Sequence, residues 1–255
     1  MKQIVFIFFT FLVSLSTSVA QRIKFLSFEA GFDFIHCDNS DKSYIHKEKP
    51  NGVIDPIFIT PEDASAYKIY TGAKIEVRSN NNKIGFVTGI RTAQIHGTFL
   101  NALGSSDYFT LSVDEAGVPA EFKIREINQT LNYLGVPVEL RYLPFGVHLV
   151  NIYFKLGADF NFLVASKTKT VFFDDGVNAN QNTVAQRIGN LGSFYSSVYG
   201  GAGIHIGRES KPGFNLELTV PSIFIQENHS LIRPVYSVGI QMGYQIPLRC
   251  LLNKP

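Results

Sequence analysis

The chain has 255 residues, of which 45% are hydrophobic, 17% charged and 13% aromatic, a length that fits one domain or two small ones with a real core. Lys and Arg number 23 against 21 Asp and Glu, and this near-balance argues against a nucleic-acid binder, which would carry a basic excess. Two cysteines exclude a disulfide-dense scaffold and a four-cysteine zinc site.

Residues 1–20 have the pattern of a cleaved secretory signal peptide. Lys2 precedes an apolar run, and Ser18-Val19-Ala20 fits the small-x-small cleavage pattern. The apolar run is shorter than the ~20 residues that a transmembrane helix, the alternative, would need. We therefore expect export through the general secretory route and one mature domain over residues 21–255. No later stretch has the ~18 uninterrupted apolar residues of a helical span.

Apolar and polar residues alternate with period two in eight segments of the mature chain, which is the pattern of half-buried strands. In the clearest segment, Phe154 and Leu156 alternate with Lys155 and Gly157. The expected strands lie at about residues 22–35, 66–78, 83–96, 130–142, 149–166, 194–207, 213–225 and 233–247.

The connections between these strands are of two lengths. Short connections alternate with long ones, except near residues 226–231, where a short one is expected in place of a long one. The long ones cover about residues 36–65, 97–129 and 167–193. Tight turns at one rim and long loops at the other are the layout of a transmembrane β-barrel.

Two features of the long segments leave alternatives open. In residues 121–134, Ile127, Leu131 and Leu134 also fit a helical stripe, so a helix is the alternative to a strand there. Apolar residues such as Phe172 either form a binding surface or belong to extended strands and pack on one another.

The two faces of the expected strands differ in chemistry. One face is uniformly apolar, whereas the other mixes glycine with charges of both signs. A soluble lipocalin-like barrel would have the opposite polarity. The sequence therefore predicts an all-β fold, an eight-stranded antiparallel up-and-down transmembrane β-barrel. The alternative, a soluble sheet with its charges in water, would need a second layer over the apolar faces.

Charges on the inner face are expected to pair, because an unpaired buried charge costs several kcal/mol. Their pairing depends on the shear of the barrel, which the sequence leaves open. This interior polar network is expected to be structural and comprises Glu29, Asp33, Lys74, Glu76, Arg91, Glu139, Arg141, Lys155, Asp159, His205 and Glu217.

No catalytic, cofactor-binding or metal-binding residues are predicted, so we expect neither an enzyme nor a cofactor. The glycines of Tyr199-Gly200-Gly201-Ala202-Gly203 lie in a strand pattern and lack a strand–turn–helix context, so they are expected to leave room for large inner residues. The six histidines lack metal-ligand spacing. Ser197 shares a face with His205 but lies roughly 26 Å away along the strand.

The stretch Tyr133-Leu134-Gly135-Val136-Pro137-Val138-Glu139-Leu140-Arg141-Tyr142 has a Y-L-x-(I/V)-P-(V/L)-x-(L/I)-(K/R)-Y shape. Together with residues 153–165 and Gly243-Tyr244-Gln245-Ile246, it resembles strands of small bacterial outer-membrane β-barrel proteins of the PorT-like and OmpA/OmpX-like kind. Such barrels commonly finish on an aromatic residue, whereas this chain continues to Pro255. Pro137 removes one ladder donor and predicts a local bulge.

The resemblance implies a location in the bacterial outer membrane, in contact with its lipid. We expect a monomeric, non-enzymatic anchor whose long segments, residues 36–65, 97–129 and 167–193, contact a protein partner or ligand; service to a secretion system is one option. The alternatives are an outer-membrane lipid-modifying enzyme and a soluble periplasmic barrel that binds an apolar ligand. A passive pore is not expected, because side chains fill a barrel of eight strands.

The two cysteines are expected to be free thiols. Cys37 follows the first strand at the long-loop rim, and Cys250 follows the last strand at the tight-turn rim. A strand of ~10 residues separates the rims by more than ~20 Å, far beyond the reach of a disulfide.

Overall fold

The computed structural model describes residues 24–38, 41–48, 54–58, 64–79, 81–100, 108–113, 119–145, 149–173, 193–208, 211–226 and 233–248. The expected signal peptide and Cys250 lie outside these residues. Within them, one antiparallel sheet contains β1 (Lys24–Asp38), β2 (Asp41–Glu48), β3 (Ile54–Phe58), β4 (Ala64–Arg78), β5 (Ile84–Leu100), β6 (Tyr108–Val113), β7 (Pro119–Tyr142), β8 (Val150–Phe172), β9 (Phe194–Ile206), β10 (Gly213–Gln226) and β11 (Arg233–Pro247). None of the described segments is a helix long and apolar enough to cross a membrane.

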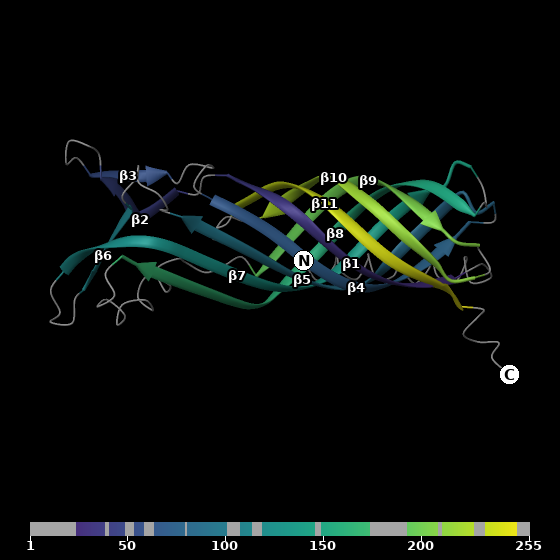
Figure 1. Cartoon of the computed structure of the whole chain (residues 1–255), viewed down its shortest axis with the longest axis horizontal. Helices are drawn as coiled ribbons and strands as arrows, with labels where there is room; N and C mark the ends of the chain where they lie inside the picture. Colours follow the sequence, from purple (N-terminus) through teal and green to yellow (C-terminus); the bar gives the residue numbers. More distant parts are fainter. Residues whose placement is uncertain are drawn as a thin grey trace, which may run out of the picture.

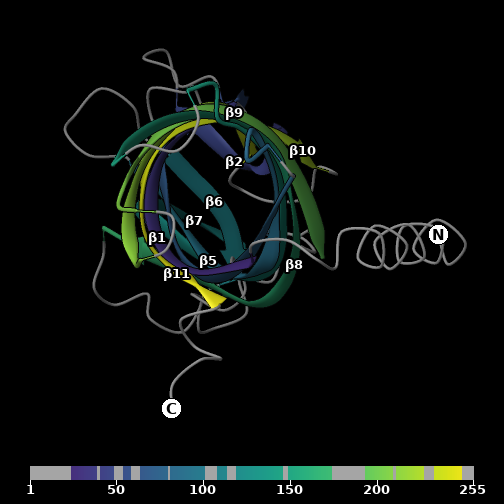
Figure 2. The same cartoon turned by 90° about the vertical axis from the view of Figure 1, so that its right-hand side faces the viewer.

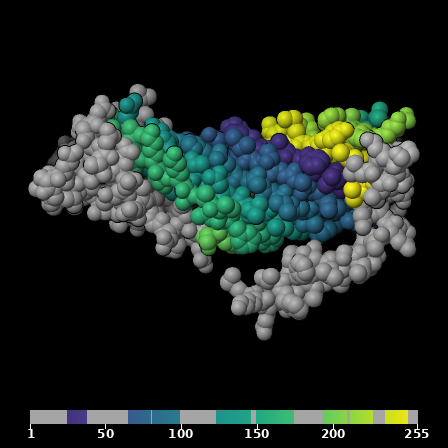
Figure 3. All heavy atoms as spheres, turned by 90° about the horizontal axis from the view of Figure 1, so that it is seen from below, coloured from purple at the N-terminus to yellow at the C-terminus, as the bar shows by residue number. Residues whose placement is uncertain are grey.

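Eight of these strands close into a barrel, which Figure 2 shows end-on. Their order around the ring is β1, β4, β5, β7, β8, β9, β10 and β11, and every neighbouring pair is antiparallel. The first and last strands lie side by side, with Phe28 opposite Tyr244, and Figure 3 shows the purple β1 against the yellow β11. The predicted eight-stranded antiparallel barrel is therefore confirmed.

The remaining strands, β2, β3 and β6, form an extension at the long-loop end of the barrel (Figure 1). β6 pairs with the start of β7, and β2 pairs with both β6 and β3. β7 and β8 are 24 and 23 residues long, well beyond the expected limits of residues 130–142 and 149–166. Much of the described part of the three expected long loops is therefore strand, because β7 and β8 continue past the expected strand ends and β6, β2 and β3 pair beside β7 in turn.

Residues 121–134 lie in β7, so the helical alternative is wrong. A register shift between Ile124 and Glu126 places Ile124 and Ile127 on the same side of the sheet, and both are buried. From Ile127 to Tyr133 the buried positions recur every second residue. A β-bulge therefore produces part of the irregular spacing that mimics a helical stripe.

Pro137 is accommodated without the expected bulge. Its register with β8 is continuous, opposite Asp159. On the other side, Gly89 and Ile90 of β5 have no partner in the ladder with β7, yet the same register resumes beyond this gap. A side chain at position 89 would lie 2.1 Å from the backbone oxygen of Ala73 in β4, so this point of β5 has room for glycine alone. The missing proline N–H therefore produces a gap in one ladder, and the predicted bulge is wrong.

Candidate functional site

The outer face of the barrel carries a continuous apolar band. The band spans Tyr236 to Ile246 on β11, about 33 Å along the strand and about 25 Å along the barrel axis at the usual tilt of about 40°. This height matches the hydrocarbon-facing band of a transmembrane barrel. Its exposed side chains include Phe28, Ile75, Ile90, Leu140, Phe154, Leu156, Leu216, Leu218, Ile240 and Met242.

Aromatic pairs lie at both ends of the apolar band. At the long-loop end, the ring centroids of Phe162 and Phe194 are 5.1 Å apart, and those of His36 and Tyr236 are 4.7 Å apart. At the tight-turn end, Phe214 and Tyr244 lie 5.0 Å apart. Aromatic girdles at two levels are typical of the two interfaces of a membrane-spanning barrel.

Beyond the band, toward the extension, the outer face becomes polar. Outward side chains of β5 and β7 form a ladder of hydrogen bonds across these strands. Gln94 donates to Asn132 (2.9 Å), His96 and Thr130 share a hydrogen bond (3.0 Å), and Thr98 donates to Asn128 (2.8 Å). The outer surface therefore changes from apolar to polar within a few residues along the same strands.

The inner face changes in the opposite sense at the same level. An inner apolar cluster occupies the long-loop end of the barrel and the base of the extension. It comprises Ile35, Cys37, Ala66, Tyr70, Ala93, Ile95, Ile124, Ile127, Leu131, Tyr133, Phe172, Tyr195 and Phe224. Phe172 is thus part of an extended, internally packed strand. Cys37, also buried here, is a free thiol.

Between this cluster and the tight-turn end, charged side chains fill the barrel interior. All eleven residues of the expected interior polar network are buried. The buried charges of the described residues are six acidic and six basic: Glu29, Asp33, Glu76, Glu139, Asp159, Glu217, Lys68, Lys74, Arg78, Arg91, Arg141 and Lys155. Sequence analysis missed Lys68 and Arg78, although both lie on the same face of β4 as Lys74 and Glu76 at period-two spacing.

Glu139 of β7 lies at the centre of this ionic network. Its carboxylate forms ion pairs with Lys74 and with Arg141, whose Nη2 is 3.0 Å from Oε2. Arg91 Nη2 lies 3.7 Å from Oε1, and the Tyr199 hydroxyl donates a 2.9 Å hydrogen bond to Oε1. One carboxylate therefore links three cations from three strands.

Arg141 and Arg91 each form ion pairs with further carboxylates on other strands of the ring. Arg141 also pairs with Glu76 (3.2 Å) and Glu217 (2.9 Å). Arg91 pairs with Glu29 (2.7 Å) and Asp159 (2.6 Å). The Lys74–Glu29 (2.5 Å), Lys155–Glu217 (2.5 Å) and Arg78–Glu76 pairs complete a network of ten charges, while Lys68 and Asp33 form a separate pair at 2.6 Å.

His205, the remaining residue of the expected set, lies near the tight-turn end. Its Nδ1 shares a 2.6 Å hydrogen bond with Asn215 Oδ1 of β10. Ser197, whose side chain is also inward on β9, pairs in register with Asp159, whereas His205 pairs with Asn151. The two residues therefore lie at different levels of the barrel.

Three inward tyrosines lie across glycines of neighbouring strands: Tyr70 over Gly31, Tyr153 over Gly203 and Tyr199 over Gly157. A Cβ added to any of these glycines would lie 2.2–2.6 Å from a ring carbon. The tyrosine hydroxyls donate to Gln241, Glu217 and Glu139 respectively. Of the glycines at positions 200, 201 and 203, Gly203 is confirmed to leave room for a large inner residue, Tyr153.

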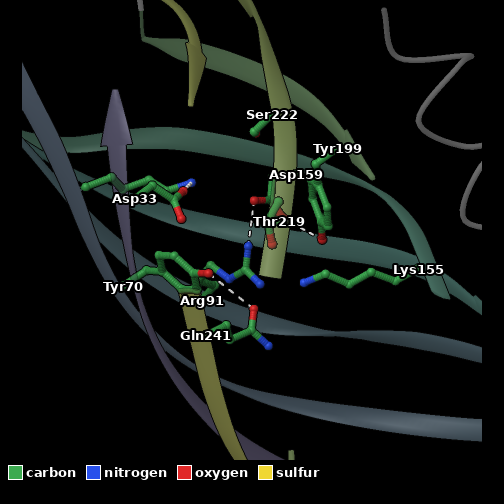
Figure 4. A pocket seen from close by; sticks show the side chains of 10 residues that line it. Asp33, Tyr70, Arg91, Lys155, Asp159, Tyr199, Thr219, Ser222 and Gln241 are labelled. Carbon is green, nitrogen blue, oxygen red and sulfur yellow. Dashed lines mark hydrogen bonds and ion pairs between the residues drawn. The ribbon is translucent and has the colours of Figure 1, made fainter. Parts of the chain in front are cut away.

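A small cavity separates the Lys68–Asp33 pair from the rest of the ionic network (Figure 4). Arg91 and Asp159 form an ion pair on one side of it, and Tyr70 donates to Gln241 on another. Its volume of about 10 Å³ is enough for about one water molecule. The described interior is thus a filled core, and this cavity is too small for a substrate.

These features define an eight-stranded antiparallel β-barrel with an apolar outer band and a filled, ion-paired interior. No family model matches the chain, and no match was found among curated proteins, so the PorT-like resemblance stays a prediction.

Among solved structures, the chain is similar to three bacterial outer-membrane proteins. OprG of Pseudomonas aeruginosa is 16% identical with a TM-score of 0.36, over 89% of this chain and 94% of that one. Ail, the attachment invasion locus protein of Yersinia pestis, is 12% identical with a TM-score of 0.31, over 88% and 99%. The N-terminal β-barrel domain of P. aeruginosa OprF is 8% identical with a TM-score of 0.31, over 87% and 97%. Such values carry no functional information, and the fold rests on this chain's own strand pairing.

Proposed function

We propose that the protein is a non-enzymatic anchor of the bacterial outer membrane, exported by means of a signal peptide at residues 1–20. The barrel would span the membrane, and the extension of β2, β3 and β6 would project from the long-loop side as an interaction surface. The observation that carries this proposal is that both faces of β5 and β7 change polarity at the same level. Toward the extension, the outer face changes from apolar to polar and the inner face from ionic to apolar.

This change of polarity is explained by two different surroundings of the same strands, lipid around the band and water beyond it. Within the band, apolar side chains such as Ile90 and Leu140 face outward while Arg91 and Glu139 face inward. Beyond the band, Gln94 and Asn132 face outward, while Ile95 and Leu131 are buried. A barrel in water buries apolar groups, whereas a barrel in lipid exposes them. One pair of strands that does both crosses a boundary between lipid and water.

The filled interior supports anchoring in preference to transport. The twelve buried charges form ion pairs with one another, and the inner apolar cluster lies between them and the extension. Side chains fill barrels of this size, so transport would require the packed interior to open. The portion of the protein available to a partner is then the outer face of the extension.

Fractionation of cells expressing the full chain tests the location. We expect the mature protein to sediment with outer membranes, to need detergent for extraction, and to migrate differently on a gel before and after heating. A chain without residues 1–20 is the control and should remain in the cytoplasm. Recovery of the exported protein as a soluble monomer without detergent would contradict the proposal.

A second variant tests whether the extension is the interaction surface. Residues 39–63, which include β2 and β3, are replaced by a tight turn between β1 and β4. We expect the barrel to insert and stay heat-modifiable, while the recovery of partner proteins after cross-linking on cells is lost. An unchanged set of cross-linked partners would show that the extension is not the interaction surface.

A further inference from the structure

The turn between β7 and β8 exposes two large apolar side chains at the end of the barrel opposite the extension. Phe145 is 65% exposed and lies three residues beyond Tyr142, the last residue of β7. Leu149 is 62% exposed and directly precedes β8. These two residues are called the apolar rim below. Neighbouring apolar side chains that stay exposed where the strands have ended are typical of a contact surface.

The lipid around the barrel does not account for Leu149. Along β8, Asn151 and Tyr153 are buried in the interior, whereas Val150 and Ile152 are exposed on the outer face. This alternation places Leu149 on the inward side, just beyond the end of the filled interior. Leu149 therefore borders the opening at the tight-turn end of the barrel, and not the hydrocarbon.

The turn that carries the apolar rim is fixed by the turns on either side of it. Leu143 N–H donates a 2.7 Å hydrogen bond to the backbone oxygen of Lys83, in the turn between β4 and β5. Gly207 N–H, in the turn between β9 and β10, donates a 2.9 Å hydrogen bond to the backbone oxygen of Leu149. The apolar rim is thus a preformed surface, which another segment can cover without reordering the turn.

The chain itself supplies an apolar segment at this end of the barrel. β11 ends here at Pro247, and its Gln245 lies opposite Gly213 at the start of β10 (Figure 1). The described residues continue to Leu248. The segment that follows has two adjacent leucines and reads Arg249-Cys250-Leu251-Leu252-Asn253-Lys254-Pro255.

The apolar rim is within reach of this segment. Around the ring, β11 and β8 are three strand spacings apart, by way of β10 and β9, which is about 14 Å. An extended chain over residues 249–252 spans about 13 Å from Leu248. The leucine side chains add to this reach, so they can contact the apolar rim across the opening.

We propose that the C-terminal segment, residues 249–255, folds back across the tight-turn opening and packs Leu251 and Leu252 on the apolar rim. Burial of apolar surface would drive this contact, since it removes Phe145 and Leu149 from water. The segment would then close the end of the barrel that the extension leaves free. This inference goes beyond the proposed anchoring role and does not depend on it.

The charges at this end give the contact a characteristic salt dependence. The described residues of the three tight turns include no acid and three exposed cations, Lys83, Arg208 and Lys211. Glu209 lies outside the described residues. The segment adds Arg249 and Lys254, so like charges face one another when it folds back. Because salt screens this repulsion, the contact should become stronger as the ionic strength rises, whereas an acidic protein bound to the same rim would be released.

Disulfide trapping in the full mature chain, folded in detergent micelles, tests this position of the segment. In every variant, Cys250→Ser removes the native thiol and Asn253→Cys places one next to Leu252. Pro144→Cys adds a second thiol beside the apolar rim. The matched control is Lys83→Cys, at the start of β5, which is also three strand spacings from β11. The readout is the rate of disulfide formation with a copper oxidant, followed on non-reducing gels and assigned by peptide mapping.

The disulfide with Pro144→Cys should form faster than that with Lys83→Cys by on the order of tenfold, because docking raises the effective concentration of the segment at the apolar rim. Adding Phe145→Ser and Leu149→Ser should abolish this difference while the protein stays heat-modifiable. Equal rates for the two positions would overturn the inference and leave the apolar rim to lipid headgroups or to another protein. A faster rate at position 144 that persists with both serines, or that falls as salt rises, would overturn it as well.

Discussion

Replacing Glu139 with alanine should lower the free energy of unfolding of the barrel by about 3–5 kcal/mol, because it removes one partner from a buried ionic network. The substitution leaves Arg141 with two of its three carboxylate partners. It also removes the nearer acceptor of the Tyr199 hydroxyl, at 2.9 Å, and leaves Asp159 at 3.4 Å. Lys74 keeps only Glu29, at 2.5 Å. Urea unfolding of the protein in lipid vesicles, followed by the heat-modifiable gel form, measures this loss.

Glu126→Ala is the matched control, since it removes a carboxylate from the outer face of the same strand. Glu126 accepts a hydrogen bond from Asn128 and is not buried. Its substitution is expected to change stability by less than about 1 kcal/mol. Equal losses for the two variants would mean that the interior pairs are not what holds the strands of this barrel together.

The second large effect is expected from a charge placed in the apolar band. Ile240 lies near the middle of the band on β11, 55% exposed, between Phe32 of β1 and Leu218 of β10. An arginine at this position would place its guanidinium near the bilayer midplane. Ile240→Arg should therefore lower stability in vesicles by about 2–4 kcal/mol.

Gln94→Arg is the comparison, because residue 94 faces outward beyond the band. An arginine there should remain in water and change stability by within about 0.5 kcal/mol. Both variants are compared by urea unfolding in the same vesicles. If Ile240→Arg is as well tolerated as Gln94→Arg, the band does not face hydrocarbon.

The barrel could be predicted from sequence because its two faces differ at every second residue. Leu156 and Lys155, for example, are assigned to opposite faces by alternation alone, and the structure places one outward and the other inward. The same rule applied along the whole of β4 would also have found Lys68 and Arg78. Local alternation is therefore sufficient for strands and faces, although it says nothing about which strands meet.

The ion pairs could not be predicted, because they depend on the register across distant strands. Glu139 and Lys74 are 65 residues apart in sequence and come from β7 and β4, which are separated by β5. Their contact requires a particular stagger of the closed sheet, which is a property of the whole ring. The hydrogen-bond partners of the inward tyrosines could not be predicted for the same reason.

The extension was interpreted as loops because its patterns are short or irregular. β2, β3 and β6 are 8, 5 and 6 residues long, and pair outside the ring. In β7, a bulge next to Ile124 interrupts the alternation, and beyond the band the inner positions become apolar while the outer ones become polar. A strand that exchanges its polar and apolar faces has no single alternating pattern for a sequence analysis to follow.

The most direct test of the membrane location uses tryptophan, which this chain lacks. Two single-tryptophan variants, Ile240→Trp in the apolar band and Gln94→Trp on the polar outer face, are reconstituted into vesicles whose lipids carry bromine on their acyl chains. Bromine quenches tryptophan fluorescence only at short range. The account predicts strong quenching at position 240 and little at position 94, whereas equally weak quenching at both positions would contradict a barrel that spans the membrane.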